Sequence, residues 1–338
     1  MKIKWGVIGC GGIAYRRTIP GMMLSENSEL VAVMDTNFDA AKKVKEEFGA
    51  KYAFSTVEEV LALDEIDAVY IATPPGLHYE QAIACLKAKK PVYLEKPFAR
   101  NYTEAKEITE AFKEAGVPLY VGHYRRALPR FLKIREMLNE ECIGKPLFIE
   151  FELNRVFSQE EADNSWLYQP ALSGGGKFYD IAPHTVDILN FLFGNITEVE
   201  GYAKNLGTGC PLENEVEMRF VTEKEVFGKA RFHCAAKEKS DRIHILGMNG
   251  SLEFSIHGKT DVILRNIKEE VIEQFNLPDP KTVEQPMVQS VVEDLLGLSK
   301  CESKAEDVLV TYEILDKVLD EFYGGRKDDF WNHPDRYQ

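Results

Sequence analysis

The amino-terminal stretch places a strand pattern, a glycine-rich turn and a helix pattern in direct succession. Residues 3–8 are predicted to form a buried strand, which leads into Gly9-Cys10-Gly11-Gly12-Ile13-Ala14, a G-x-G-x-x-A sequence at the start of a predicted helix. In this context Gly9 permits a tight turn, Gly11 lets the backbone approach a pyrophosphate, and Ala14 keeps helix and strand close together. The helix N-terminus would offer free amides to the phosphates. The pattern therefore predicts a dinucleotide-binding βαβ unit.

An acidic residue at the end of the next predicted strand supports this expectation. Asp35 follows the strand over residues 29–34, about 20 residues beyond the glycines, where a carboxylate can accept hydrogen bonds from adenosine ribose hydroxyls. The same carboxylate would repel a 2′-phosphate, so NAD is favoured over NADP, although Lys42 and Lys43 could reach such a phosphate. The alternative is that Asp35 only caps the helix expected near Phe38.

Strand and helix patterns alternate through the first 122 residues. Further strands are predicted over residues 67–72, 92–94 and 117–121, and further helices over residues 57–63, 78–88 and 103–115, the first of them opened by a capping-box pattern at Thr56–Glu59. Such alternation is typical of a parallel, doubly wound α/β sheet. We therefore expect a Rossmann NAD(P)-binding domain over residues 1–122.

The predicted strand over residues 92–94 ends abruptly in Glu95-Lys96-Pro97. Proline has no amide to give to a strand ladder, so strand pairing is expected to stop there. Ligands of open α/β sheets bind beyond the carboxyl ends of the strands, which would place Lys96 as a cation in a cleft. The alternative is a solvated charge pair that closes a strand. His78 is expected to begin a helix beside the cofactor, without a catalytic role.

The remaining residues, 123–338, show a different pattern. Strands with short links are predicted over residues 148–157, 198–203, 216–221, 226–234, 243–246 and 251–256, and helices over residues 131–138, 289–298 and 306–323. Successive strands of this kind predict an α+β domain with a large, mainly antiparallel open sheet. One face of the sheet would carry helices. The other face is expected to form a homodimer or homotetramer interface.

Three consecutive glycines, Gly174-Gly175-Gly176, interrupt the strands and precede a helix pattern that runs to about Phe193. Asp180, His184 and Asp187 lie at positions i, i+4 and i+7, so they share one face of this helix. An acid and an imidazole on one face can form a buried structural pair. With a nucleotide-binding fold upstream, a functional role is the better interpretation.

Composition argues against several functional classes. The formal net charge of −14, from 41 Lys and Arg against 55 Asp and Glu, argues against a general binder of nucleic acids or anionic membranes. No apolar stretch is long enough to span a bilayer, and the first residues contain no signal-peptide core. The six cysteines are scattered, without C-x-x-C spacing. They indicate reduced thiols in a cytoplasm, and neither a disulfide framework nor a metal site.

Together the motifs resemble the family named for glucose-fructose oxidoreductase, inositol dehydrogenase and a rhizopine-catabolism protein (Gfo/Idh/MocA), over essentially the whole chain. The stretches that carry the resemblance are Gly9 to Ala14, Ala72-Thr73-Pro74, Glu95-Lys96-Pro97, Arg126 with Pro129, the three glycines with Asp180, His184 and Asp187, and the hairpin from Ile245 to Leu252. Two positions depart from the family pattern. Pro75 stands where many members have asparagine, and Leu167 follows Trp166 where many have arginine.

The resemblance implies an enzyme, an NAD(P)-dependent dehydrogenase or reductase that transfers a hydride between a nicotinamide and a secondary alcohol or ketone of a sugar, polyol or related molecule. The family's catalytic lysine falls on Lys96 and its acid–histidine pair on Asp180 and His184, and its typically cis proline falls on Pro97. His184 would act as general base in oxidation, Lys96 would stabilise negative charge on the same oxygen, and Asp180 would orient the substrate.

Further binding residues follow from the same resemblance and motifs. Those expected to contact the cofactor are Gly9, Cys10, Gly11, Gly12, Ile13, Ala14, Asp35, Thr73, Pro74, His78, Glu95, Lys96, Pro97 and Trp166. Those expected to contact the substrate are Lys96, Tyr124, Arg126, Asn154, Asp180 and His184, with the polar loop over residues 158–165 as a possible cover. Two other functions stay open: a nucleotide-binding regulator or sensor without turnover, and an NAD-assisted glycosidase.

Overall fold

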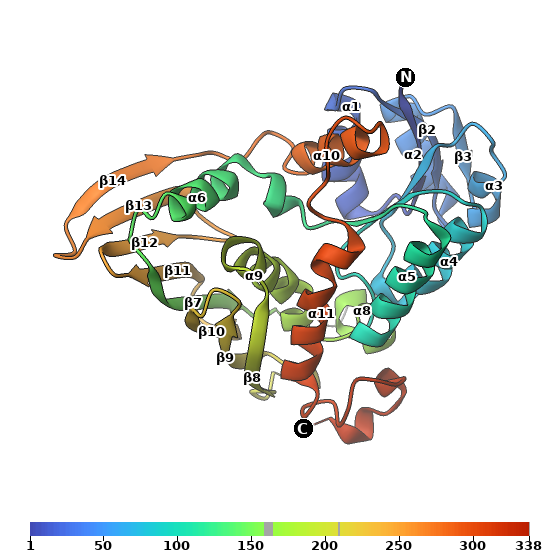
Figure 1. Cartoon of the computed structure of the whole chain (residues 1–338). Helices are drawn as coiled ribbons and strands as arrows, with labels where there is room; N and C mark the ends of the chain where they lie inside the picture. Colours follow the sequence, from blue (N-terminus) through green and yellow to red (C-terminus); the bar gives the residue numbers. More distant parts are fainter. Residues whose placement is uncertain (159–164, 209, 338) are drawn as a thin grey trace. The chain divides into compact units, whose positions relative to one another are not determined.

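The computed structural model describes residues 1–158, 165–208 and 210–337. Its contacts divide the chain into two compact units (Figure 1). The first unit comprises residues 1–99, 103–128 and 280–309, and the second comprises residues 100–102, 129–279 and 310–338. The single boundary expected near Gly122 therefore describes only part of this division. The chain re-enters the first unit late, and the short segment 100–102 belongs to the second unit.

A parallel six-stranded sheet forms the centre of the first unit. Its strands are β1 (Ile3–Ile8), β2 (Ser28–Met34), β3 (Tyr52–Phe54), β4 (Ala68–Ile71), β5 (Val92–Leu94) and β6 (Leu119–Val121), in the order β3-β2-β1-β4-β5-β6. All neighbouring strands are parallel. The chain order reverses between β1 and β4, which makes the carboxyl edge of these two strands the topological switch point. The expected Rossmann arrangement is confirmed.

Helices alternate with the strands of this sheet as the sequence predicts. They are α1 (Ile19–Leu24), α2 (Phe38–Phe48), α3 (Val57–Leu61), α4 (His78–Lys87) and α5 (Tyr102–Ala115). After the chain returns, α10 (Gln285–Leu295) and the first turn of α11 (Ala305–Leu319) also belong to this unit, whereas the sequence predicts both helices in the second domain. The capping box before α3 is present. The helix after the glycine turn opens differently from the prediction, with a π-helical stretch at Ala14–Thr18. Pro20 has no amide to donate to the carbonyl four residues earlier. The amide of Ile19 donates to the carbonyl of Ala14, five residues earlier, which is the π-helical spacing.

Two carboxyl groups are buried in the core of the first unit. Glu95 is 4% exposed and Glu284 is 0% exposed. The hydroxyl of Tyr70 donates to Glu95 Oε1 at 2.6 Å, and that of Tyr93 donates to Glu284 Oε2 at 3.1 Å. Desolvation raises the pKa of both carboxyl groups, and the charge of Glu95 raises the pKa of Glu284 further.

An eight-stranded sheet dominates the second unit. Its strands are β7 (Pro146–Val156), β8 (Ile196–Lys204), β9 (Glu215–Thr222), β10 (Phe227–Ala236), β11 (Ser240–Gly247), β12 (Gly250–Phe254), β13 (Asp261–Asn266) and β14 (Val271–Asn276), in the order β14-β13-β12-β11-β7-β10-β9-β8. Among the described pairings within this sheet, only that of β7 with β10 is parallel. The mainly antiparallel sheet is confirmed. The sequence did not indicate β13 or β14, and β14 is almost fully exposed, so it lacks an apolar alternation.

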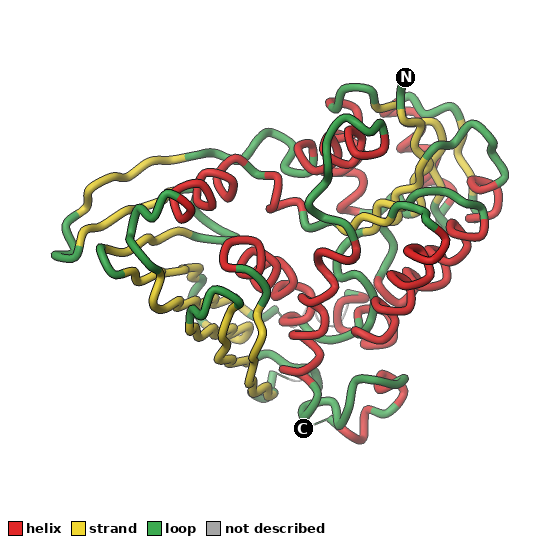
Figure 2. Tube along the Cα trace, viewed as in Figure 1, coloured by secondary structure: helices red, strands yellow, loops and turns green. Residues whose placement is uncertain are grey.

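Helices α6 (Pro129–Asn139) and α9 (Lys177–Phe193) lie on one face of this sheet (Figures 1 and 2). Phe178 of α9 packs edge-on against Phe232 of β10, with ring centroids 4.8 Å apart. The other face carries charged cross-strand pairs, such as Lys229 with Glu150 at 2.7 Å. A hollow of about 610 Å³ lies over this open face. A homodimer or homotetramer interface on it stays a prediction.

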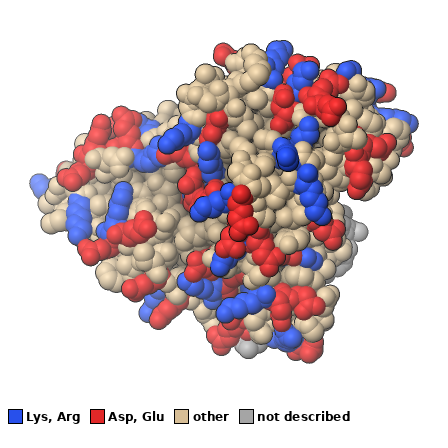
Figure 3. All heavy atoms as spheres, turned by 45° about the vertical axis from the view of Figure 1, so that its right-hand side comes forward, with Lys and Arg blue, Asp and Glu red and all other residues tan. Residues whose placement is uncertain are grey.

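Acidic and basic side chains are interspersed over the face of the molecule that Figure 3 shows. Within the described ranges, no helix combines the length and apolar character needed to cross a membrane. The same residues contain no group of three or more His, Cys, Asp or Glu side chains arranged to hold a metal ion.

The buried pair of glutamates predicts how stability depends on pH. A raised pKa means that the folded protein holds a proton that the unfolded chain releases near pH 4.5. The free energy of unfolding therefore falls as the pH rises from about 4.5 toward the raised pKa. Glu284→Gln removes this cost. Its stability relative to wild type should therefore grow with pH, by at most about 1.4 kcal/mol per pH unit.

Thermal melting between pH 5 and pH 9 measures this difference, with the exposed Glu306→Gln as the matched control. A Glu284→Gln difference that stayed flat over this range, like that of the control, would show that Glu284 is ionised throughout.

Candidate active site

The glycine turn after β1 is shaped by close backbone contact. Gly9 has φ +93°, and a Cβ at this position would lie 2.9 Å from the carbonyl of Ala72, so only glycine fits. Around Gly11, none of the described atoms outside Gly11 and its two chain neighbours lies within 4 Å of the place that a Cβ would occupy. The backbone at Gly11 is therefore open to the approach of a ligand.

Asp35 lies directly beside this turn. Its carboxylate accepts hydrogen bonds from the amide of Cys10 at 2.8 Å and from the amide of Asn37 at 2.8 Å. The alternative helix-cap role of Asp35 is wrong, because Asn37 is the N-cap residue of α2 and its side chain accepts from the amide of Asp39. Burial, together with the charge of Asp35, raises the pKa of the Cys10 thiol to about 12, so the thiol is not a nucleophile.

These features fit a dinucleotide. An open glycine backbone and a helix start that no described side chain caps can receive phosphate oxygens, and a carboxylate beside them can receive ribose hydroxyls. The loop after β4, which starts at Ala72, follows the neighbouring strand across the switch point. Thr73 in this loop donates through Oγ1 to Gln81 at 2.6 Å, so the side chain of Thr73 is anchored to α4.

His78 is fully buried between two loops of the first unit. Its Nε2 lies 2.8 Å from the carbonyl oxygen of Thr73, and its Nδ1 lies 3.1 Å from that of Phe98. Burial lowers the pKa of His78 to about 4, so the ring is neutral at pH 7 and its single N–H donates to one of the two carbonyls. His78 therefore orders the two loops from within. The expected contact of His78 with the cofactor stays a prediction.

Lys96 follows the carboxyl end of β5. The amide of Glu95 makes the last bond of the ladder to Ile71, at 2.9 Å, and the peptide bond between Lys96 and Pro97 is cis, as the resemblance implies. Glu95 Oε2 accepts from the amide of Lys96 at 3.2 Å. The Glu95 side chain thus fixes the backbone of Lys96 from inside the core, and the expected contact of Glu95 with the cofactor stays a prediction.

Two expected pocket-wall residues lie in the 3₁₀ helix Tyr124–Ala127 of the first unit. Tyr124 and Arg126 are each 7% exposed. Arg126 Nη1 donates to the carbonyl of Glu302 at 2.6 Å, so its guanidinium joins this turn to the stretch over residues 280–309. A substrate contact for either residue stays a prediction.

In the second unit, the start of α9 is built around a buried carboxylate. Gly176 is the N-cap residue, and both carboxylate oxygens of Glu213 accept from its amide, at 2.8 and 2.9 Å. Glu213 Oε1 also accepts from the amide of Tyr179 at 3.2 Å. A Cβ at Gly176 would lie 2.8 Å from Glu213 oxygens, so glycine is required for this approach. Glu213 therefore serves the first-turn amides of α9, which have no partner within the helix.

Asp180, His184 and Asp187 project from one face of α9, as predicted. His184 is 9% exposed, Asp187 is 1% exposed and Asp180 is partly buried. The ring of His184 meets that of His257, with centroids 5.8 Å apart at 67°. His257 Nε2 lies 3.1 Å from Thr185 Oγ1, and its amide donates to Asp241 at 2.5 Å. The sequence did not indicate His257, because a single histidine after a strand carries no motif.

The structure places the two remaining predicted binding residues, Asn154 and Trp166, in different surroundings. Asn154 donates to Glu152 and to Ser240, both at 2.7 Å, and lies on the open face of the sheet. The adjacent Leu153 is buried on the other face, which α9 covers. The structure therefore does not bring Asn154 to the face that α9 covers, because side chains alternate along a strand. Trp166 begins the 3₁₀ helix Trp166–Tyr168 and is 38% exposed. Most of the expected covering loop, residues 159–164, lies outside the described residues.

Comparisons with known proteins extend this description. A family model described as "Oxidoreductase family, NAD-binding Rossmann fold" matches residues 3–123, and the GFO/IDH/MocA C-terminal domain matches residues 131–253. The chain is 33% identical to Oxidoreductase P35 of Formosa agariphila, over 93% of this chain and 98% of that protein. It is 29% identical to scyllo-inositol 2-dehydrogenase (NADP(+)) IolU of Bacillus subtilis, over 92% of each.

Among solved structures, the WlbA dehydrogenase of Bordetella pertussis in complex with NADH and UDP-GlcNAcA superposes with a TM-score of 0.80 at 25% identity, over 94% of this chain and 95% of that one. The two family models cover the dinucleotide turn, the β5 lysine and the start of α9 in one chain. This protein therefore belongs to the Gfo/Idh/MocA family of oxidoreductases, whose amino-terminal domain is an NAD-binding Rossmann fold.

Proposed function

We propose that the protein catalyses the NAD(P)-dependent oxidation of a secondary alcohol on a sugar, polyol or related small molecule, or the reverse reduction. The shared face of α9 on which Asp180 and His184 lie, in a chain with Lys96 two residues beyond the end of β5, carries this proposal. The similarity to a scyllo-inositol 2-dehydrogenase supports the substrate class.

The chain's own side chains would manage the proton and the charge on oxygen. A bound nicotinamide supplies the hydride acceptor or donor. Carbon loses a hydride only if the hydroxyl proton is accepted, and neutral His184 would accept it, since imidazole has an unperturbed pKa of about 6.5. Lys96 Nζ would donate to the same oxygen and stabilise its negative charge. Asp180 would orient the substrate.

Asp35 supports NAD as the preferred cofactor. Its carboxylate beside the glycine turn would repel a 2′-phosphate. The lysines that could offset this repulsion have other contacts. Lys42 lies 3.7 Å from the carboxylate of Asp39, and Lys43 lies over the ring of Tyr15 at 4.4 Å.

A screen for NADH production tests the proposal. Wild-type protein with NAD should produce NADH from at least one member of a panel of sugars and polyols. Lys96→Met keeps the length of the side chain but removes its charge, so it should bind NADH normally and turn over about 100-fold or more slowly.

Lys87→Met, on the exposed surface of α4, is the matched control and should retain the wild-type rate. Sugar release without net NADH would favour the NAD-assisted glycosidase instead. Nucleotide binding without any turnover would favour a regulator.

Cofactor preference should depend on Asp35. Asp35→Asn preserves shape but removes the charge, so the preference for NADH over NADPH should fall by about 10-fold or more, the scale of a hydrogen bond to a charged group. Fluorescence titration of both cofactors measures the two Kd values. Asp64→Asn, exposed in the turn after α3, should leave their ratio unchanged. A wild-type protein that bound NADPH more tightly would refute the preference.

The pH dependence of turnover should follow His184. The neutral ring accepts a proton in oxidation and the protonated ring donates one in reduction, so kcat/KM should rise with pH for oxidation and fall for reduction. His184→Asn should flatten both profiles and lower the rate by about 100- to 10,000-fold. His244→Asn, on the open face of β11, is the control. If His184→Asn kept the wild-type profile, the proton carrier would be another group.

A further inference from the structure

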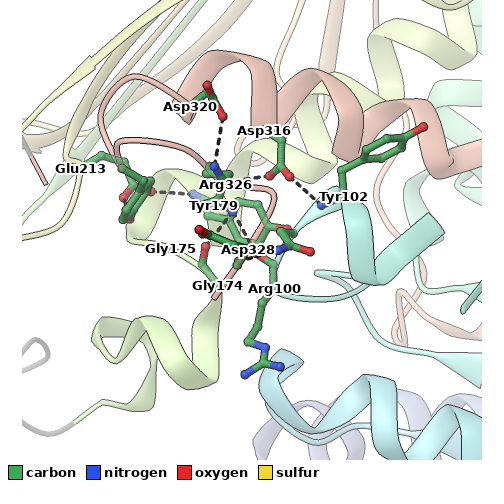
Figure 4. Close-up of polar contacts among 12 residues, drawn as sticks. Arg100, Tyr102, Gly174, Gly175, Tyr179, Glu213, Asp316, Asp320, Arg326 and Asp328 are labelled. Atoms are coloured by element: carbon green, nitrogen blue, oxygen red, sulfur yellow. Dashed lines mark hydrogen bonds and ion pairs between the residues drawn. The ribbon is translucent and has the colours of Figure 1, made fainter. Parts of the chain in front are cut away.

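A buried arginine from the carboxyl-terminal segment organises the start of α9 (Figure 4). Arg326 is 0% exposed. Its Nε donates to Asp316 Oδ1 at 2.8 Å, and its Nη2 donates to two backbone carbonyls, that of Arg100 at 2.9 Å and that of Gly174 at 2.8 Å. Asp316 Oδ2 in turn accepts from the amide of Tyr102 at 2.7 Å. One planar guanidinium thus joins three separate stretches of the second unit.

Aromatic rings enclose this cation. The guanidinium carbon lies 4.6 Å from the ring centroid of Tyr179, 4.9 Å from that of Tyr323 and 4.3 Å from that of Phe330. A buried charge is costly unless it is paired and hydrogen-bonded, and ring faces add attraction to a desolvated cation. The aromatic tail that includes Phe330 is therefore packed against Arg326, and the arginine fork matches carbonyl and carboxylate acceptors that a lysine could not satisfy together.

The same segment reaches α9 by a second route. The hydroxyl of Tyr323 donates to Glu213 Oε2, and Glu213 accepts from the amides of Gly176 and Tyr179. Figure 4 shows Glu213 and Arg326 converging on the glycine turn from different elements. A Cβ at Gly174, which has φ +77°, would lie 2.6 Å from the backbone of Arg100. This close approach explains the first glycine of the three.

The two carbonyls bound by Arg326 belong to the segments that carry the proposed chemistry. Arg100 is four residues after Lys96 in the chain, and Gly174 is six residues before Asp180 and ten before His184. Neither carbonyl is part of a ladder or a helix interior, because both lie in loops. A change at Arg326 would therefore be transmitted along short stretches of backbone to all three proposed catalytic groups.

We propose that Arg326 is a positioning residue for the reaction, which fixes the chain leaving Lys96 to the glycine turn that begins the helix of Asp180 and His184. The catalytic part of this inference rests on the proposed function. Tyr323 and Glu213 act with Arg326 by fixing the first-turn amides of the same helix.

Amide hydrogen exchange tests this positioning without any substrate. Arg326→Lys keeps the charge but removes the planar guanidinium that donates to Asp316 and to both carbonyls. Amides over residues 100–103 and 174–180 should therefore exchange about 10- to 100-fold faster, the scale of a lost hydrogen bond to a charged group. Amides of β4, in the core of the first unit, should be unchanged. Arg336→Lys is the matched control in the same tail, where Arg336 forms a half-exposed pair with Asp328 at 3.1 Å.

Unchanged exchange in both stretches would overturn the proposal. If Arg326→Lys does not fold, Tyr323→Phe, which removes a single hydroxyl, takes its place. It should then speed exchange at the amides of Gly176 and Tyr179, and unchanged exchange there would overturn the proposal equally.

Single-turnover kinetics separate positioning from simple stabilisation. With enzyme in excess, NAD and the panel compound that wild type oxidises fastest, the rate constant of NADH formation should fall by about 10- to 100-fold in Arg326→Lys, while its amplitude and the Kd of NADH stay near wild type. A lower amplitude with an unchanged rate constant would show a structural role only, and would refute positioning. If no panel compound reacts, the proposed function fails, and the exchange result still decides whether Arg326 fixes the two segments.

Discussion

Parallel pairing of β1, β4 and β5 is the constraint on which the first unit depends. Each loop at the carboxyl edge begins with a bond to the strand beside it: the amide of Ala72 donates to Ile8 at 2.8 Å and the amide of Glu95 donates to Ile71 at 2.9 Å. The glycine turn, the Thr73 loop and Lys96 are therefore delivered to one edge by the ladder itself. Buried carboxyl and imidazole groups, Glu95 and His78, then fix these loops from inside.

In the second unit, the corresponding constraint is the buried start of α9, which lies next to a tight turn. The amides at the start of α9 need acceptors, and glycine at 176 lets Glu213 come close enough to provide them, while glycine at 174 lets the backbone of Arg100 approach. Burying Glu213 raises its pKa, a cost that the Tyr323 hydroxyl and the nearby Arg326 charge offset in part. The polar groups that hold the helix are thus as buried as the apolar core around them.

Chain-local patterns predicted much of this molecule. Continuous apolar strands, the glycine spacing, the strand-ending Lys96 and the helical spacing of Asp180 and His184 all depend on neighbours in the sequence, and the structure places them as expected. The misses involve tertiary relationships. The return of residues 280–309 to the first unit is decided by packing at a distance, and the orientation of Asn154 by which face of the sheet α9 covers. Glu213, His257 and Arg326 carry no motif, since the bonds that tie them to Tyr179, Thr185 and Arg100 span 34, 72 and 226 residues.

The proposed reaction is the transfer of a hydride between the carbon of an alcohol and a nicotinamide. A deuterium label on that carbon reveals whether this transfer occurs. A polyol deuterated at the reacting C–H is incubated with protein and NAD, and the NADH formed is examined by proton NMR. We expect the label to move to one face of C4 of the nicotinamide, without exchange with water. Product formation with the label lost to solvent, or retained on the sugar, would contradict it.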